Sequence, residues 1–305
     1  MDIGIALPQM GPYASPATIV QIAQEAERLD YASVWVGERL LRPRHYVPYG
    51  YPPIPMPDYF KTMYDPLETL SYVAAKTERI KLGTSVINAF FHVPVVLARR
   101  FATLDQFSQG RVIAGLGQGW LKDEFETANI SFQRRGNGLA DYMGALRAAW
   151  GPDPVHYEGR FYRIVESDIG PKPFQPDGGP PVLFGAVSKV ALERAARLAN
   201  GLNPIARTWS SLEQIARIFP EMVRQAGRDP QQMLIVVRSN NAVGEPHLSE
   251  ASGPRTPLSG SLPQIRDDVQ RLESLGIGHI FFDLLDMPIH EQLRLLEKLR
   301  RVADR

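Results

Sequence analysis

Short apolar runs alternate with longer amphipathic segments along the whole chain. Residues 3–7 are almost continuously apolar, which is typical of a buried strand. Residues 18–29 instead carry apolar side chains at positions 19, 22, 23, 26 and 29, the spacing of one helix face. The repeated pattern predicts strands at residues 3–7, 33–36, 80–87, 112–116, 182–185, 201–204, 234–238 and 280–284, and helices at residues 18–29, 67–77, 94–107, 139–150, 189–199, 212–226, 263–275 and 289–302.

This alternation of strands and helices indicates the fold class. It favours parallel strands joined by right-handed crossovers. Eight such units in 305 residues fit an α/β fold of the (β/α)8 TIM-barrel type better than an open doubly wound sheet, although periodicity does not itself show closure. We expect one barrel domain over residues 1–305, with an active-site loop at 39–65 and a Gly/Pro-rich insertion at 151–181 that contains a hairpin at 156–164. Residues 240–258 are predicted to form a further loop.

Composition and charge exclude several classes of protein. Lys and Arg number 34 against 33 Asp and Glu, and no basic block occurs, so we expect neither nucleic acid nor a membrane surface as partner. The absence of cysteine excludes disulfides, thiolate zinc sites and a cysteine nucleophile. The first residues lack a basic signal-peptide region, and no apolar run approaches the ~20 residues of a membrane span. We therefore expect a cytoplasmic protein.

The histidines and serines give no signature of metal or hydrolase chemistry. The six histidines show no spacing typical of metal ligands, so we expect no metal site. A Gly-x-Ser-x-Gly motif is also absent, which disfavours a serine hydrolase.

In a barrel of this type the active site lies where the strands end, so the residues that follow each strand are the candidates. Glu38 and Arg39 follow the second strand, either as a functional pair or as a charged pair on a solvated loop. Ser85 and Val86 belong to a third strand that ends in small and polar residues. Such an ending indicates either close approach of a flat ligand or a strand that leaves the core.

Two glycine-containing segments follow the fourth and fifth strands. Residues 115–120 (GLGQGW) lack the third glycine of a dinucleotide fingerprint, but their glycines indicate a sharp bend or a close approach of backbone, beside the aromatic Trp120. Residues 185–188 (GAVS) lead into a helix whose first N–H groups could bind a phosphate. Ser188 is equally a plain helix cap.

Together, several segments resemble the luciferase-like monooxygenase superfamily over essentially the whole chain. They are residues 29–43 (LDYASVWVGERLLRP), 77–86 (TERIKLGTSV), 108–112 (SQGRV), 115–120 (GLGQGW), 123–125 (DEF), 185–188 (GAVS) and 276–280 (GIGHI). The ERLLRPR version of the second-strand segment resembles the deazaflavin-dependent branch, which uses coenzyme F420, more than the FMN branch.

The resemblance implies a cofactor site. It implies that the Ser85–Val86 peptide is cis and forms a bulge behind the cofactor ring, with Gly117 and Gly119 close to the ring. It also implies that Gly185, Ala186 and Val187, with Ser188, hold the cofactor phosphate through backbone N–H groups. In the sugar-phosphate dehydrogenases of this branch, a His stands at the position of Arg39 and a proton-donating Glu at that of Trp120. These departures argue against a sugar-phosphate substrate.

We therefore expect an oxidoreductase that transfers a hydride between F420 and a small, hydrophobic organic substrate. Arg39 would stabilise charge on the ring or the substrate, and Glu38 would orient Arg39. Aromatic residues of the loop after the second strand would cover the site. One alternative is an FMN-dependent monooxygenase that uses dioxygen, and another is a non-enzymatic cofactor carrier. The resemblance further suggests a homodimer formed through the helices at 67–77 and 94–107.

Overall fold

Eight parallel strands close into a barrel in the computed structural model, which describes residues 1–50, 53–176, 178–241, 243–244, 254–285 and 287–303. Each of these strands pairs with the next one along the chain, and the last pairs with the first, so the ring is complete. The predicted (β/α)8 fold is confirmed. The strands are β1 (Asp2–Ala6), β2 (Ser33–Val36), β5 (Lys81–Thr84), β7 (Val112–Gly117), β10 (Val182–Phe184), β11 (Gly201–Leu202), β12 (Leu234–Ser239) and β13 (His279–Phe282).

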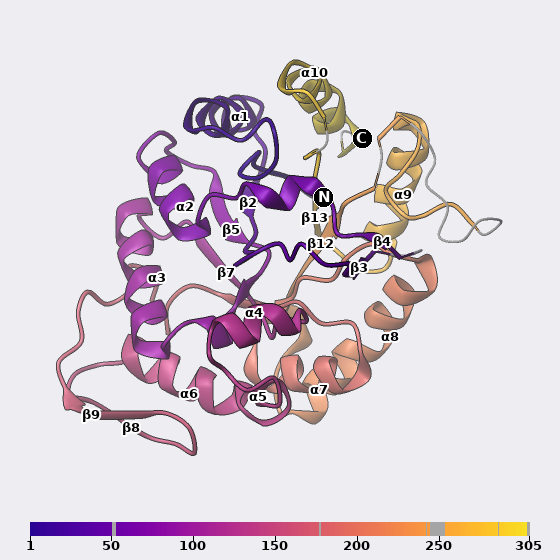
Figure 1. Ribbon diagram of the computed structural model, residues 1–305. Helices are drawn as coiled ribbons and strands as arrows, with labels where there is room; N and C mark the ends of the chain where they lie inside the picture. The colour runs from indigo at the N-terminus through magenta and orange to yellow at the C-terminus, as the bar shows by residue number, and fades with distance from the viewer. Residues whose placement is uncertain (51–52, 177, 242, 245–253, 286, 304–305) are drawn as a thin grey trace.

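The eight longest helices formed by the described residues surround the strands (Figure 1). Pro16, Pro66 and Pro94 open the first three of them, at a position where a missing N–H costs no hydrogen bond. The helices are α1 (Pro16–Arg28), α2 (Pro66–Ala74), α3 (Pro94–Ser108), α6 (Leu139–Trp150), α7 (Lys189–Leu198), α8 (Trp209–Gln225), α9 (Leu262–Ser274) and α10 (Ile289–Arg300). No helix formed by the described residues is both long and apolar enough to cross a membrane.

Large side chains fill the inside of the barrel. Trp35 stacks on Phe281 with ring centroids 4.7 Å apart, within a buried cluster that includes Leu183. A Cβ atom at Gly83 would lie 2.3 Å from the Trp35 ring. Glycine at this point of the third strand therefore makes room for the indole.

Several shorter elements interrupt the regular alternation. In the loop after β2, β3 (Pro48–Tyr49) pairs with β4 (Ile54–Pro55) ahead of a 3-10 turn at Asp58–Lys61. The hairpin predicted at 156–164 is present as β8 (Val155–Glu158) and β9 (Arg163–Ser167), outside α6.

The structure differs from the predicted elements in three places. The strand predicted at 80–87 is divided, because β5 ends at Thr84 and a second short strand, β6 (Ile87–Asn88), pairs with β7. Two short helices, α4 (Lys122–Thr127) and α5 (Arg134–Asn137), were not expected. Of the loop predicted at 240–258, residues 242 and 245–253 lie outside the described residues.

A buried histidine is hydrogen-bonded to a serine in the barrel wall. Nε2 of His279, on β13, lies 2.8 Å from the Ser33 hydroxyl, which also accepts a hydrogen bond from the Trp35 indole. Burial lowers the pKa of His279 to about 4. The folded protein therefore holds this imidazole neutral at neutral pH.

We predict that His279 makes the protein less stable in acid. Below pH 6.5 the unfolded chain takes up a proton that the folded state does not, so the free energy of unfolding falls, by about 2 kcal/mol at pH 5. His279→Gln keeps an acceptor for Ser33 but does not titrate, and urea titrations between pH 7 and 5 should show a correspondingly smaller loss. His156→Gln, on the exposed face of β8, is the control. Equal slopes in wild type and His279→Gln would contradict the prediction.

Candidate active site

The carboxyl ends of the barrel strands meet at one mouth, over which α4 and the β3–β4 segment lie (Figure 1). The predicted candidates Glu38, Arg39, Ser85 and Trp120 all follow or end strands at this mouth. The structure also brings to the mouth residues that sequence reasoning did not single out. They are Asn88, His92, Glu124, Asn203, Arg238 and Asp283.

The Ser85–Val86 peptide is cis, as predicted. Three separate segments of the chain hold Ser85 in place: its N–H donates to Val36 O at 2.6 Å, and its hydroxyl donates to Asn203 Oδ1, just after β11, at 2.6 Å. Its carbonyl accepts from Arg238 Nη1 at 2.8 Å. Because every polar group of Ser85 is bonded, the bulge between β5 and β6 has one fixed position.

Arg238 is itself fixed by two further hydrogen bonds. Nη2 donates to Asp283 Oδ2 at 2.6 Å, and Nε donates to Asn240 Oδ1 at 2.6 Å. The Asp283 side chain is only 4% exposed, so it needs this counter-charge. In the sequence, the only indication of this site was an arginine near the end of an apolar strand. The sequence did not predict that Asp283 is its partner.

Glycines at the ends of β7 and β10 make room for the side chains of Val86 and Asn88. A Cβ atom at Gly117 would lie 2.5 Å from Val86 Cγ2, and one at Gly185 would lie 3.4 Å from Val86 Cγ1. Gly119 has φ +67°, and a Cβ there would lie 2.0 Å from Asn88 Nδ2. Val86 thus lies between the ends of β7 and β10. Contact of Gly117 and Gly119 with a cofactor stays a prediction.

Glu38 is bonded through both oxygens, and not to Arg39. Oε1 lies 2.7 Å from His92 Nε2, and Oε2 accepts the Asn88 backbone N–H at 2.7 Å. Nδ2 of Asn88 is buried without a hydrogen-bond partner among the described residues. The expectation that Glu38 orients Arg39 is therefore wrong, because its carboxylate is committed to the segment that follows β6.

Glu124, on α4, is the carboxylate that holds Arg39. Its Oε2 accepts from Arg39 Nη1 at 2.8 Å, and its Oε1 accepts the Leu40 N–H at 2.7 Å. Burial raises the pKa of Glu124, and the opposing effect of Arg39 does not fully offset it. The guanidinium lies 5.1 Å from the Phe60 ring centre and 5.2 Å from that of Trp120. Arg39 is thus a largely buried cation next to two aromatic rings.

The residues that follow β10 are only partly available to bind a phosphate. Gly185 N–H donates to Leu116 O at 3.1 Å, because the ladder between β10 and β7 continues one residue further. The prediction that this N–H binds phosphate is therefore wrong. The N–H groups of Ala186, Val187 and Ser188 have no acceptor among the described residues. Ser188 also caps α7 by accepting the Ala191 N–H at 3.4 Å.

The segment after β2 encloses an apolar cluster beside the mouth. Met10, Val47, Met56, Phe60 and Leu121 are buried together, and Tyr49 packs against them. Tyr49 lies 5.3 Å from Phe60 and 6.2 Å from Trp120 between ring centres. Tyr46 points away, as an exposed side chain, and Tyr51 lies outside the described residues. The predicted aromatic loop thus presents an apolar inner side next to Arg39.

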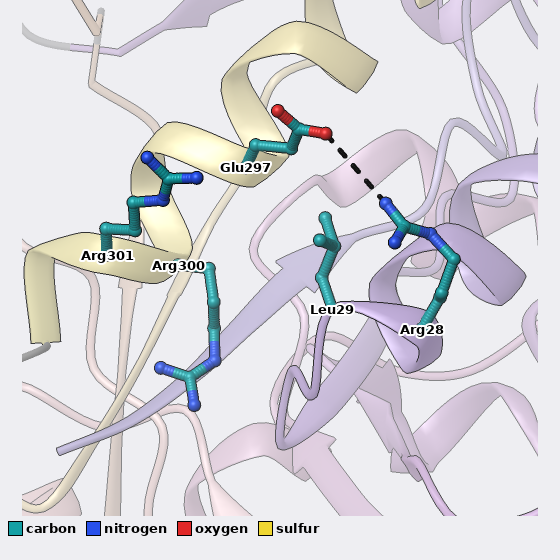
Figure 2. A pocket seen from close by; sticks show the side chains of 5 residues that line it. All are labelled: Arg28, Leu29, Glu297, Arg300 and Arg301. Carbon is teal, nitrogen blue, oxygen red and sulfur yellow. Dashed lines mark ion pairs between the residues drawn. The ribbon is translucent and has the colours of Figure 1, made fainter.

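Figure 2 shows a different depression, of about 390 Å³, between the ends of α1 and α10. It lies where helices end and strands begin, opposite to the mouth. Three of its charged side chains are engaged: Arg28 lies 3.9 Å from Glu297 and also pairs with Glu25, and Arg300 Nε donates to Asp30 O at 3.1 Å. In a barrel of this type that end serves stability, so we assign this depression no catalytic role.

Comparisons with known proteins agree with this architecture. An uncharacterized protein of Mycobacterium tuberculosis is 29% identical over 247 residues, 80% of this chain and 78% of the relative. An F420-dependent glucose-6-phosphate dehydrogenase of Amycolatopsis mediterranei is 31% identical over 193 residues, 61% of this chain and 52% of the relative. The crystal structure of monooxygenase RslO1 from Streptomyces bottropensis matches with a TM-score of 0.77 at 22% identity, over 99% and 98% of the two chains.

The family model described as luciferase-like monooxygenase matches residues 1–278. This match covers seven of the eight strands completely, from β1 to β12, together with every candidate residue at the mouth except Asp283. On this evidence the chain belongs to the luciferase-like monooxygenase family of oxidoreductases.

Proposed function

We propose that the protein is an F420-dependent oxidoreductase that transfers a hydride between the deazaflavin and a small hydrophobic organic substrate. The observation that carries the proposal is the Ser85–Val86 bulge. It would offer a flat ring the apolar side chain of Val86, next to a serine whose backbone N–H and carbonyl are both hydrogen-bonded. The F420-dependent relative at 31% identity supports the deazaflavin in preference to FMN.

The start of α7 fits the phosphate of such a cofactor. The N–H groups of Ala186, Val187 and Ser188 have no acceptor among the described residues, and they precede a helix of 10 residues whose dipole favours an anion. Residues 182–192 contain no Asp or Glu that would repel it. We assign the phosphate to these three N–H groups, without Gly185.

The chemistry divides between cofactor and chain. Bound F420 would supply the hydride donor or acceptor. Val86 would support the ring, and the apolar side of the loop would exclude water. We assign the accompanying proton to His92, whose Nε2 lies 2.7 Å from Glu38. Since both oxygens of Glu38 are engaged, Glu38 would act as a positioning residue for His92.

We predict that the purified protein binds F420 with micromolar affinity and does not bind FMN measurably. The two are compared in separate titrations, by the fluorescence of each cofactor. The reverse result, together with oxygen consumption in the presence of reduced FMN, would instead support the monooxygenase alternative. Binding of neither cofactor would contradict the proposal.

We predict that a negative charge at Val187 weakens cofactor binding. Val187 is 49% exposed, so substitution there should leave the fold intact. Val187→Asp places a carboxylate against the phosphate and should weaken F420 binding at least tenfold more than Val187→Asn, which has nearly the same size and no charge. Equal affinities of the two variants would show that the phosphate binds elsewhere.

We also propose a homodimer formed through α2 and α3, whose outer sides expose Tyr72, Val96 and Phe107. Replacement of Val96 and Phe107 together by Glu should convert the dimer into a monomer in sedimentation experiments. Val165→Glu, at another exposed valine, on β9, should leave the dimer intact. A monomeric wild type, or a dimeric double variant, would exclude this interface.

A further inference from the structure

One edge of the Arg39 guanidinium has no hydrogen-bond partner among the described residues. Nη1 donates to Glu124, but Nε is buried and unbonded, and Nη2 also lacks a hydrogen-bond partner among the described residues. In a guanidinium, the N–H groups of Nε and Nη2 point in the same direction and can bind two oxygens at once. Arg28 uses this edge for Glu25 in the same protein, at 2.9 Å from Nε and 2.7 Å from Nη2.

The surroundings fix this edge at the mouth of the barrel. The Arg39 side chain is only 11% exposed, and its partner Glu124 is 3% exposed and held in addition by the Leu40 N–H. Phe60 and Trp120 lie 5.1 and 5.2 Å from the guanidinium carbon. A buried N–H without an acceptor costs free energy, which a bound acceptor would recover. Such a site favours a ligand that is flat and carries two coplanar oxygens.

We propose that the open edge of Arg39 binds the carboxylate of an aromatic or conjugated substrate, whose planar part lies against Trp120 and Phe60. The proposal rests on the proposed function, since this ligand is the molecule that exchanges a hydride. Arg39 is the specificity-determining residue, and Glu124 is a positioning residue that holds its guanidinium. Lysine could not replace Arg39, because an ammonium group cannot present two parallel N–H bonds.

The test uses 2-naphthoate as probe and 2-naphthamide, its neutral counterpart, in calorimetric titrations of the full-length protein with and without F420. Wild type should bind naphthoate saturably and at least tenfold more tightly than naphthamide. Arg39→Lys keeps the charge but removes the edge, and it should weaken naphthoate binding at least tenfold. Arg44→Lys, at an exposed arginine of the same loop, should leave the affinity unchanged. Thermal unfolding of each variant confirms that it is folded.

Three results would overturn the proposal: no saturable binding of naphthoate to wild type, equal binding of acid and amide, or an unchanged affinity in folded Arg39→Lys. F420 affinity, measured separately, distinguishes the two proposals. Naphthoate binding that depends on Arg39 without any F420 binding would sink the proposed cofactor and leave the carboxylate site standing. Loss of F420 binding in Arg39→Lys with unchanged naphthoate binding would instead assign the edge to the cofactor.

Discussion

Closure of the strand ladder is the constraint on which the candidate site depends. Because β7 pairs with β10 and β13 with β1, residues far apart in the chain reach the same mouth. Arg238 and Ser85 are 153 residues apart, yet the guanidinium of one donates to the carbonyl of the other. Asn203, 118 residues from Ser85, bonds its hydroxyl. An open sheet would separate these groups, so the fixed bulge is a product of the closed barrel.

Each buried charge at the mouth has its own partner, as the low polarity of the surroundings requires. Glu124 holds Arg39 and Asp283 holds Arg238, while Glu38 is bonded to His92 and to a backbone N–H. Such pairing leaves little freedom to reorganise when a ligand binds. On the proposal made above, the polar groups that stay unbonded in this arrangement would select the ligand.

The strands and helices could be predicted because each apolar pattern is local to its own segment. The rule that barrel sites lie at strand ends also located Glu38, Arg39 and Ser85 at the mouth. Their partners could not be predicted, since Glu124 lies 85 residues beyond Arg39 and His92 lies 54 residues beyond Glu38. Pairings over such separations depend on the placement of α4 and of the segment after β6, which periodicity does not specify.

For the glycines, too, the sequence predicted the feature but not its partner. The run after β7 indicated close approach, but from the sequence the approaching group could equally be a ligand or a neighbouring side chain. Val86 and Asn88 occupy the space that side chains at Gly117 and Gly119 would need. These glycines make room for the bulge and let Val86 lie between β7 and β10, so any effect on a ligand would pass through Val86. A ligand at this mouth would then meet two kinds of contact, an apolar support from Val86 and a directional polar contact from Arg39. Val86 follows β5 and Arg39 follows β2, and these two strands are neighbours in the barrel.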